Sequence, residues 1–62
     1  MDNPSELLAA LARMEEILNR GIQVTVEPRD PAPVVLIKVT NTEDHVLVPE
    51  ITELALLLHQ YA

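Results

Sequence analysis

The segment Ile22-Gln23-Val24-Thr25-Val26-Glu27 decides the fold, because its apolar and polar residues alternate without a break. Successive side chains of a β-strand point to opposite faces, so this pattern predicts a half-buried strand over residues 22–27. A second run, residues 34–39, is apolar on both faces except at Lys38 and is expected to be the central strand of a small sheet. The loop between them, residues 28–33, contains prolines, which cannot donate hydrogen bonds to a ladder and therefore separate the two strands.

The residues before this strand carry the signals of a helix. Asn3 can cap the first turn, Pro4 suits the first helical position, and Glu6 lies where the helix dipole favours an acid. Gly21, the only glycine of the chain, stands where helices commonly end in a left-handed residue. The residues expected on the buried face, at spacings of four, three and four, are Leu7, Leu11, Met14 and Leu18, with Leu8 and Ile17 beside them.

A turn at residues 41–44 is expected to lead into a short third strand, His45 to Val48, which Pro49 ends. Pro49 and Glu50 then open a second helix. The residues expected on its buried face are Ile51, Leu54, Ala55, Leu58 and Tyr61. The predicted fold class is α+β: a single domain, residues 1–62, in which a three-stranded antiparallel meander carries two helices on one face, in the order αβββα.

The charge balance excludes several classes of partner. Ten acidic and four basic residues give a net charge of −6, and the basic residues form no stripe that could neutralise phosphates. The same negative charge disfavours an anionic membrane surface. No apolar run approaches the roughly 20 residues of a membrane-spanning helix, and the N-terminus does not resemble a signal peptide. We therefore expect a cytoplasmic protein that binds neither nucleic acid nor membrane.

No residue pattern indicates catalysis or metal binding. A structural metal site needs three or four convergent ligands, and the chain has no cysteine and only two histidines. Glu43, Asp44 and His45 are interpreted as a solvated turn, and Glu50 and Glu53 as acids that favour a helix start. One glycine and one serine exclude phosphate loops and the nucleophile elbow. We expect no cofactor, no metal and no enzymatic activity.

An interface is predicted instead. A chain of 62 residues is marginally stable without additional stabilisation from disulfides, a bound metal or oligomerisation. Because the chain has no cysteine and no metal site is expected, oligomerisation is the remaining source of that stabilisation. If alternate strand residues enter the core, their neighbours must point outward, where they would cluster on adjacent strands. The residues predicted to form this protein interface are Val34, Leu36 and Leu47 on the uncovered sheet face, with Leu56 on the second helix.

Two resemblances to known families cover small parts of this picture. Ile17-Leu18-Asn19-Arg20-Gly21-Ile22 resembles the helix-to-strand junction of the small gas-vesicle shell proteins, which are also acidic and of this size. The predicted αβββα order, with its excess of acid, resembles in layout some phage-encoded inhibitors of CRISPR nucleases. Neither resemblance assigns a role to any residue.

The leading hypothesis is a small acidic homo-oligomeric binding or regulatory protein that acts through protein–protein contacts. Its first partner would be a second copy of itself, in a homodimer or a higher oligomer, and another protein is a further candidate. Two alternatives stay open. One is a self-assembling structural subunit, and the other is an acidic inhibitor that blocks a basic nucleic-acid-binding protein.

Overall fold

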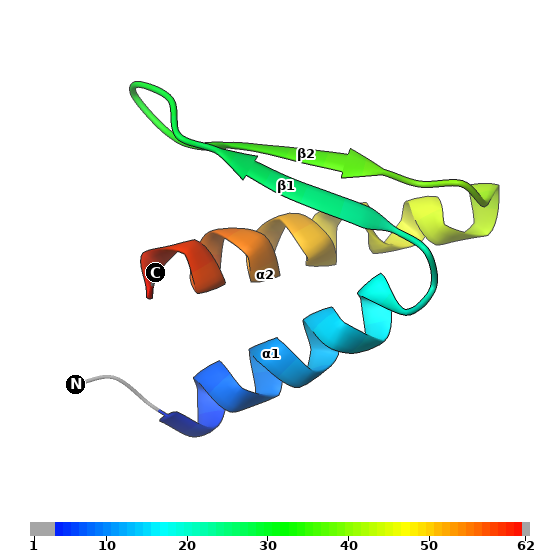
Figure 1. Cartoon of the computed structure of the whole chain (residues 1–62), viewed down its shortest axis with the longest axis horizontal. Helices are drawn as coiled ribbons and strands as arrows, with labels where there is room; N and C mark the ends of the chain where they lie inside the picture. The colour runs from blue at the N-terminus through cyan, green and yellow to red at the C-terminus, as the bar shows by residue number, and fades with distance from the viewer. Residues whose placement is uncertain (1–3, 62) are drawn as a thin grey trace.

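The computed structural model describes residues 4–61 as two helices, a hairpin and a short 3₁₀ helix. The elements in chain order are α1 (Pro4–Leu18), β1 (Gln23–Glu27), β2 (Val34–Lys38), η1 (Thr42–Leu47) and α2 (Val48–Gln60). The hairpin and α1 diverge from the turn that joins them, and α2 appears between the two in the view of Figure 1. Helix α2 contacts both strands, whereas α1 packs mainly against α2. The two helices therefore cover the sheet unequally.

The hairpin confirms that both predicted segments are strands, but the second is not a central strand, because the described sheet has two strands only. β1 and β2 pair antiparallel, with Val24 opposite Ile37 and Val26 opposite Val35. These four side chains pack against the core, as expected from period two. The pairs that point to the other face are Gln23 with Lys38, Thr25 with Leu36, and Glu27 with Val34.

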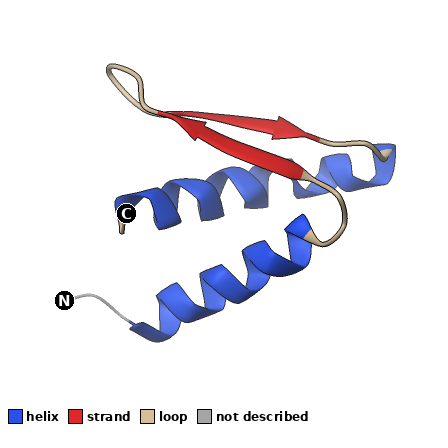
Figure 2. Ribbon diagram, in the orientation of Figure 1, coloured by secondary structure: helices blue, strands red, loops and turns tan. Residues whose placement is uncertain are grey.

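The predicted third strand is wrong. Within the described residues the sheet has two strands, and the stretch Thr42–Leu47 is helical, as Figure 2 shows. The fold is small and α+β, but it is not the predicted three-stranded αβββα meander. The resemblance in layout to the phage-encoded inhibitors depended on the third strand and is therefore not supported. Val46, which lies within the predicted strand His45 to Val48, is 79% exposed.

The physical reason lies in the length and the flanks of the segment. Alternation over the four residues His45 to Val48 is too short to distinguish a strand from one helical turn. The backbone N–H of Asp44 donates to the carbonyl of Asn41 at 3.0 Å. This hydrogen bond closes a helical turn immediately before His45. Pro49 lies in the first turn of α2, where its missing N–H is not needed, so this proline continues a helical path.

Helix α1 is confirmed, but its buried face is rotated from the predicted one. Its buried residues are Ala10, Met14 and Ile17. Leu11 and Leu18, expected in the core, are exposed, and so is Leu8. Gly21 has φ of +90° and ends the helix as predicted, whereas the predicted cap at Asn3 lies outside the described residues.

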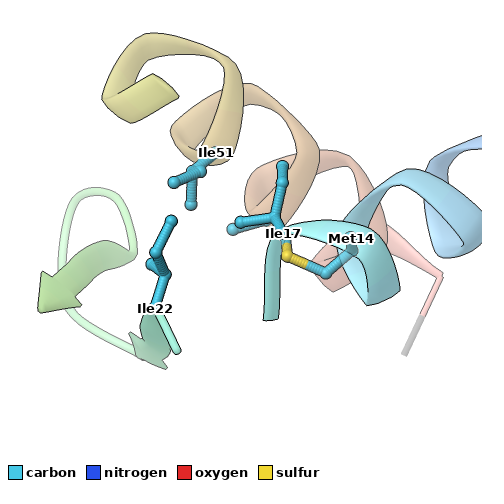
Figure 3. Packing of buried hydrophobic residues seen from close by; sticks show 5 residues of the cluster. Met14, Ile17, Ile22 and Ile51 are labelled. Carbon is cyan, nitrogen blue, oxygen red and sulfur yellow. The ribbon is translucent and has the colours of Figure 1, made fainter. Parts of the chain in front are cut away.

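The core sits where α1, the start of the hairpin and α2 meet. Ile17, Ile22 and Ile51 approach one another from these three elements, with Met14 beside them (Figure 3). Ala55 completes this buried cluster. The predicted face of α2 is confirmed except at its end, where Tyr61 is exposed.

Candidate functional site

The four residues predicted to form an interface do not lie together. Val34 and Leu36 are exposed on the outer face of β2 and are neighbours on that face. Leu47 lies in η1, where it is partly buried against the core. Leu56 is half-buried on α2, which covers the opposite face of the hairpin. The structure therefore keeps two of the four as a possible contact surface on the sheet.

Polar side chains surround that pair. The three outward residues of β1 are all polar: Gln23, Thr25 and Glu27. On β2, Lys38 is the next outward residue after Leu36. The outer sheet patch, defined here as Val34 and Leu36, is consequently a narrow apolar strip with a polar margin. Patches of this size are common on monomeric proteins, so the strip alone is weak evidence of binding.

A second apolar surface lies on the other side of the hairpin, and the sequence did not predict it. An open groove of about 270 Å³ runs between α1, β1 and α2. It forms because α1 packs against α2 and leaves part of the inner face of β1 uncovered. The residues that line this α1–β1 groove are Met14, Leu18, Val24, Val26, Ala55, Leu58 and His59.

The groove continues onto the exposed side of α1. Leu18 lines the groove and is itself exposed, and Leu11 lies on the same side of the helix, two turns nearer the N-terminus. Leu8, still nearer the N-terminus, is 66% exposed. We call these three residues, Leu8, Leu11 and Leu18, the α1 leucine face. The signal for it was present in the sequence, because α1 carries more leucines than one buried stripe requires.

Two arginine–carboxylate pairs connect α1, and the turn that follows it, to the C-terminal half of the chain. Arg13 donates from Nε to Oε2 of Glu50 at 2.6 Å and from Nη2 to Oε1 at 3.0 Å. Arg20 donates to Asp44, whose side chain is 2% exposed. Arg13 lies in α1 and Arg20 in the turn that follows it, so the two pairs connect this part of the chain to α2 and to η1.

The Arg13–Glu50 pair also changes the acid–base behaviour of both groups. The hydrogen bonds from Arg13, together with its positive charge, lower the pKa of Glu50 below the usual range, while partial desolvation opposes the shift. The hydrogen bond to Glu50 and its negative charge raise the pKa of Arg13. Arg13 also contacts Glu16 at 3.3 Å. These charges are therefore engaged within the fold.

No chemical centre stands out elsewhere in the described part of the chain. Within residues 4–61, no group of three or more histidine, cysteine, aspartate or glutamate side chains is arranged to hold a metal ion. Asp44, interpreted from sequence as part of a solvated turn, is instead buried and paired with Arg20. Among the same residues, no helix combines the length and the hydropathy needed to cross a membrane.

The size and lining of the α1–β1 groove indicate what it can hold. Its volume lies just below the roughly 300–1,000 Å³ of small-molecule pockets, and apart from His59 its lining side chains are apolar. Such an open hollow suits one or two aliphatic side chains better than a polar ligand. No protein-family model, curated protein or solved structure matches this chain.

Proposed function

We propose that this protein is a small acidic binding protein that associates with itself and acts through protein–protein contacts. The observation that carries the proposal is the α1–β1 groove, which is continuous with the α1 leucine face. Contiguous apolar surface of this kind is typical of interaction sites, whereas single exposed leucines need no explanation. A regulatory role would be exercised through the same contacts.

The openness of the fold supports self-association. The chain exposes 4673 Å², whereas a compact monomer of 6.9 kDa would expose about 4,000 Å². Its radius of gyration is 12.0 Å, against about 10.6 Å for a compact domain of 62 residues. A standard interface buries about 800 Å² on each partner, which is close to the surplus area. A second copy could therefore bury surface area that a compact monomer of this size would not expose.

The test is the oligomeric state as a function of concentration. Sedimentation at micromolar concentration should show a discrete dimer or a larger species of fixed size. The melting temperature should rise with protein concentration, because association stabilises only the folded chain. A compact monomer whose melting temperature does not change over a hundredfold range of concentration would contradict the proposal.

A second candidate is a self-assembling structural subunit, favoured by the outer edge of β2. Among the described residues no further strand pairs with this edge, and the strand Val34–Lys38 carries a single charge. An uncovered apolar edge is a template for pairing with another chain. Together with the groove it would give each copy two different contacts, which permits open-ended assembly. Light scattering separates the two candidates, because only a structural subunit should form assemblies whose size increases without limit. Leu36→Glu should stop that increase in size.

A further inference from the structure

We infer that the α1–β1 groove receives the first turns of α1 from a second copy of this chain, with the two α1 helices packed antiparallel about a two-fold axis. This inference rests on the proposed self-association and specifies its geometry. The leucine that enters the groove is Leu8, and Leu11 lies near the axis. The outer sheet patch stays outside the contact.

The spacing of residues on α1 indicates that its partner is a helix. Leu7, Leu11, Met14 and Leu18 repeat at intervals of four, three and four, which is the pattern of a helix–helix seam. Within one chain Met14 is buried and Leu7 is half-buried, whereas Leu11 and Leu18 are exposed. Within residues 4–61, no element therefore covers Leu11 and Leu18. The spacing of all four residues nevertheless matches the contact face of a helix that packs against a second helix.

The position of the groove indicates the direction of that helix. Met14 and Leu18, the α1 residues that line the groove, lie toward the C-terminal end of the helix. Leu8, the most exposed leucine of the α1 leucine face, lies toward the N-terminal end. A parallel pair would bring two grooves together with nothing to fill them. An antiparallel pair brings Leu8 of each copy to the groove of the other, and the opposed helix dipoles favour the same arrangement.

A second copy is the occupant because the surface is complementary to itself. One end of α1 offers a free leucine and the other end offers an apolar hollow of about 270 Å³. A two-fold axis makes both contacts at once, as an isologous interface requires. The surplus exposed area, about 700 Å² over a compact monomer, approaches the share of one partner in a standard interface. Each chain carries a charge of −6, so added salt should strengthen the contact by screening repulsion.

Two exposed leucines provide a matched test of the surface. Leu11 is 48% exposed and Leu36 is 47% exposed, so replacing either with glutamate changes a similar amount of surface without entering the core. Leu11→Glu should raise the dimer dissociation constant by at least about 100-fold, because a symmetric contact loses two leucines. Leu8→Glu should act in the same direction. Leu36→Glu should leave the dimer intact, and circular dichroism should show that all three variants remain folded.

Cross-linking tests the orientation, since the chain has no natural cysteine. Leu8→Cys and Leu18→Cys are prepared separately, mixed, and treated with a short bismaleimide. The antiparallel pair should give cross-linked heterodimers from the mixture and little product from Leu18→Cys alone, because with Leu11 near the axis the two Leu18 positions lie about 20 Å apart along the helices. Efficient cross-linking of Leu18→Cys to itself would mean a parallel pair and would overturn the inference.

The possible failures are distinguishable. If the natural chain is a dimer that Leu36→Glu dissociates while Leu8→Glu and Leu11→Glu do not, the inference is wrong and self-association stands, with the outer sheet patch as its site. If the natural chain stays monomeric at every concentration and salt, the proposed function itself fails. A dimer that loses affinity in Leu11→Glu and Leu8→Glu, and keeps it in Leu36→Glu, supports both.

Discussion

Arg20 donates two hydrogen bonds to a single carboxylate oxygen of Asp44, from Nε at 3.1 Å and from Nη2 at 2.7 Å. Asp44 is 2% exposed, whereas Arg20 is 55% exposed, so the buried partner of this pair is the acid. A buried carboxylate without a partner is costly, and the guanidinium relieves that cost. The contact ties the residues that follow α1 to η1, at the place where a third strand was predicted.

Removing this acid should destabilise the fold. Asp44→Asn keeps the shape of the side chain but weakens the charged hydrogen bonds, at an expected loss of about 1–3 kcal/mol of unfolding free energy. That is a large part of the roughly 3–5 kcal/mol that a core of this size supplies. Urea unfolding followed by circular dichroism would measure it. The matched control is Glu27→Gln, whose exposed pair with Arg29 spans 3.5 Å and should change stability by less than about 0.5 kcal/mol. Equal midpoints for the two variants would contradict the prediction.

The Arg13–Glu50 pair should give the stability a specific dependence on pH. Because the hydrogen bond from Arg13 lowers the pKa of Glu50 in the folded state, the unfolded chain binds that proton more readily. The contribution is therefore fully present above the ordinary glutamate pKa of about 4.3 and is lost as the pH falls through the lower folded value. The melting temperatures of the natural chain and of Glu50→Gln should therefore converge as the pH falls below that ordinary value. Glu53→Gln, which removes an exposed acid one turn further along α2, is the control and should not converge in this way.

The absence of a third strand from residues 4–61 can be tested by replacing single side chains with alanine. Val46 is 79% exposed in η1, so Val46→Ala should change the unfolding free energy by less than about 0.5 kcal/mol. A core valine on a strand would cost considerably more. Ile17→Ala is the positive control, because Ile17 is fully buried and its truncation should cost about 2–5 kcal/mol. A loss for Val46→Ala that approaches the loss for Ile17→Ala would restore the three-stranded model.

Several elements were predictable because their signals are local. The alternation of residues 22–27 and the apolar run that follows the proline loop identify a hairpin, since period two is a property of the strand itself. Gly21 marks the end of α1 for an equally local reason, because its φ of +90° is unfavourable for residues with a side chain. The apolar face of α2 likewise follows from its own spacing.

Other features depended on contacts between distant residues. The apolar residues of α1 span more than one face, so spacing alone could not show which would be buried. The pairs Arg13–Glu50 and Arg20–Asp44, separated by 37 and 24 residues, join α1 and the turn after it to α2 and η1. In this packing Ala10 and Ile17 are buried and Leu11 is exposed. The sequence by itself determined that α1 is amphipathic and that residues 22–38 form a hairpin. Only the tertiary structure decided which leucines stay exposed and where the groove opens, because burial of a helix face depends on the element packed against it and not on the helix alone.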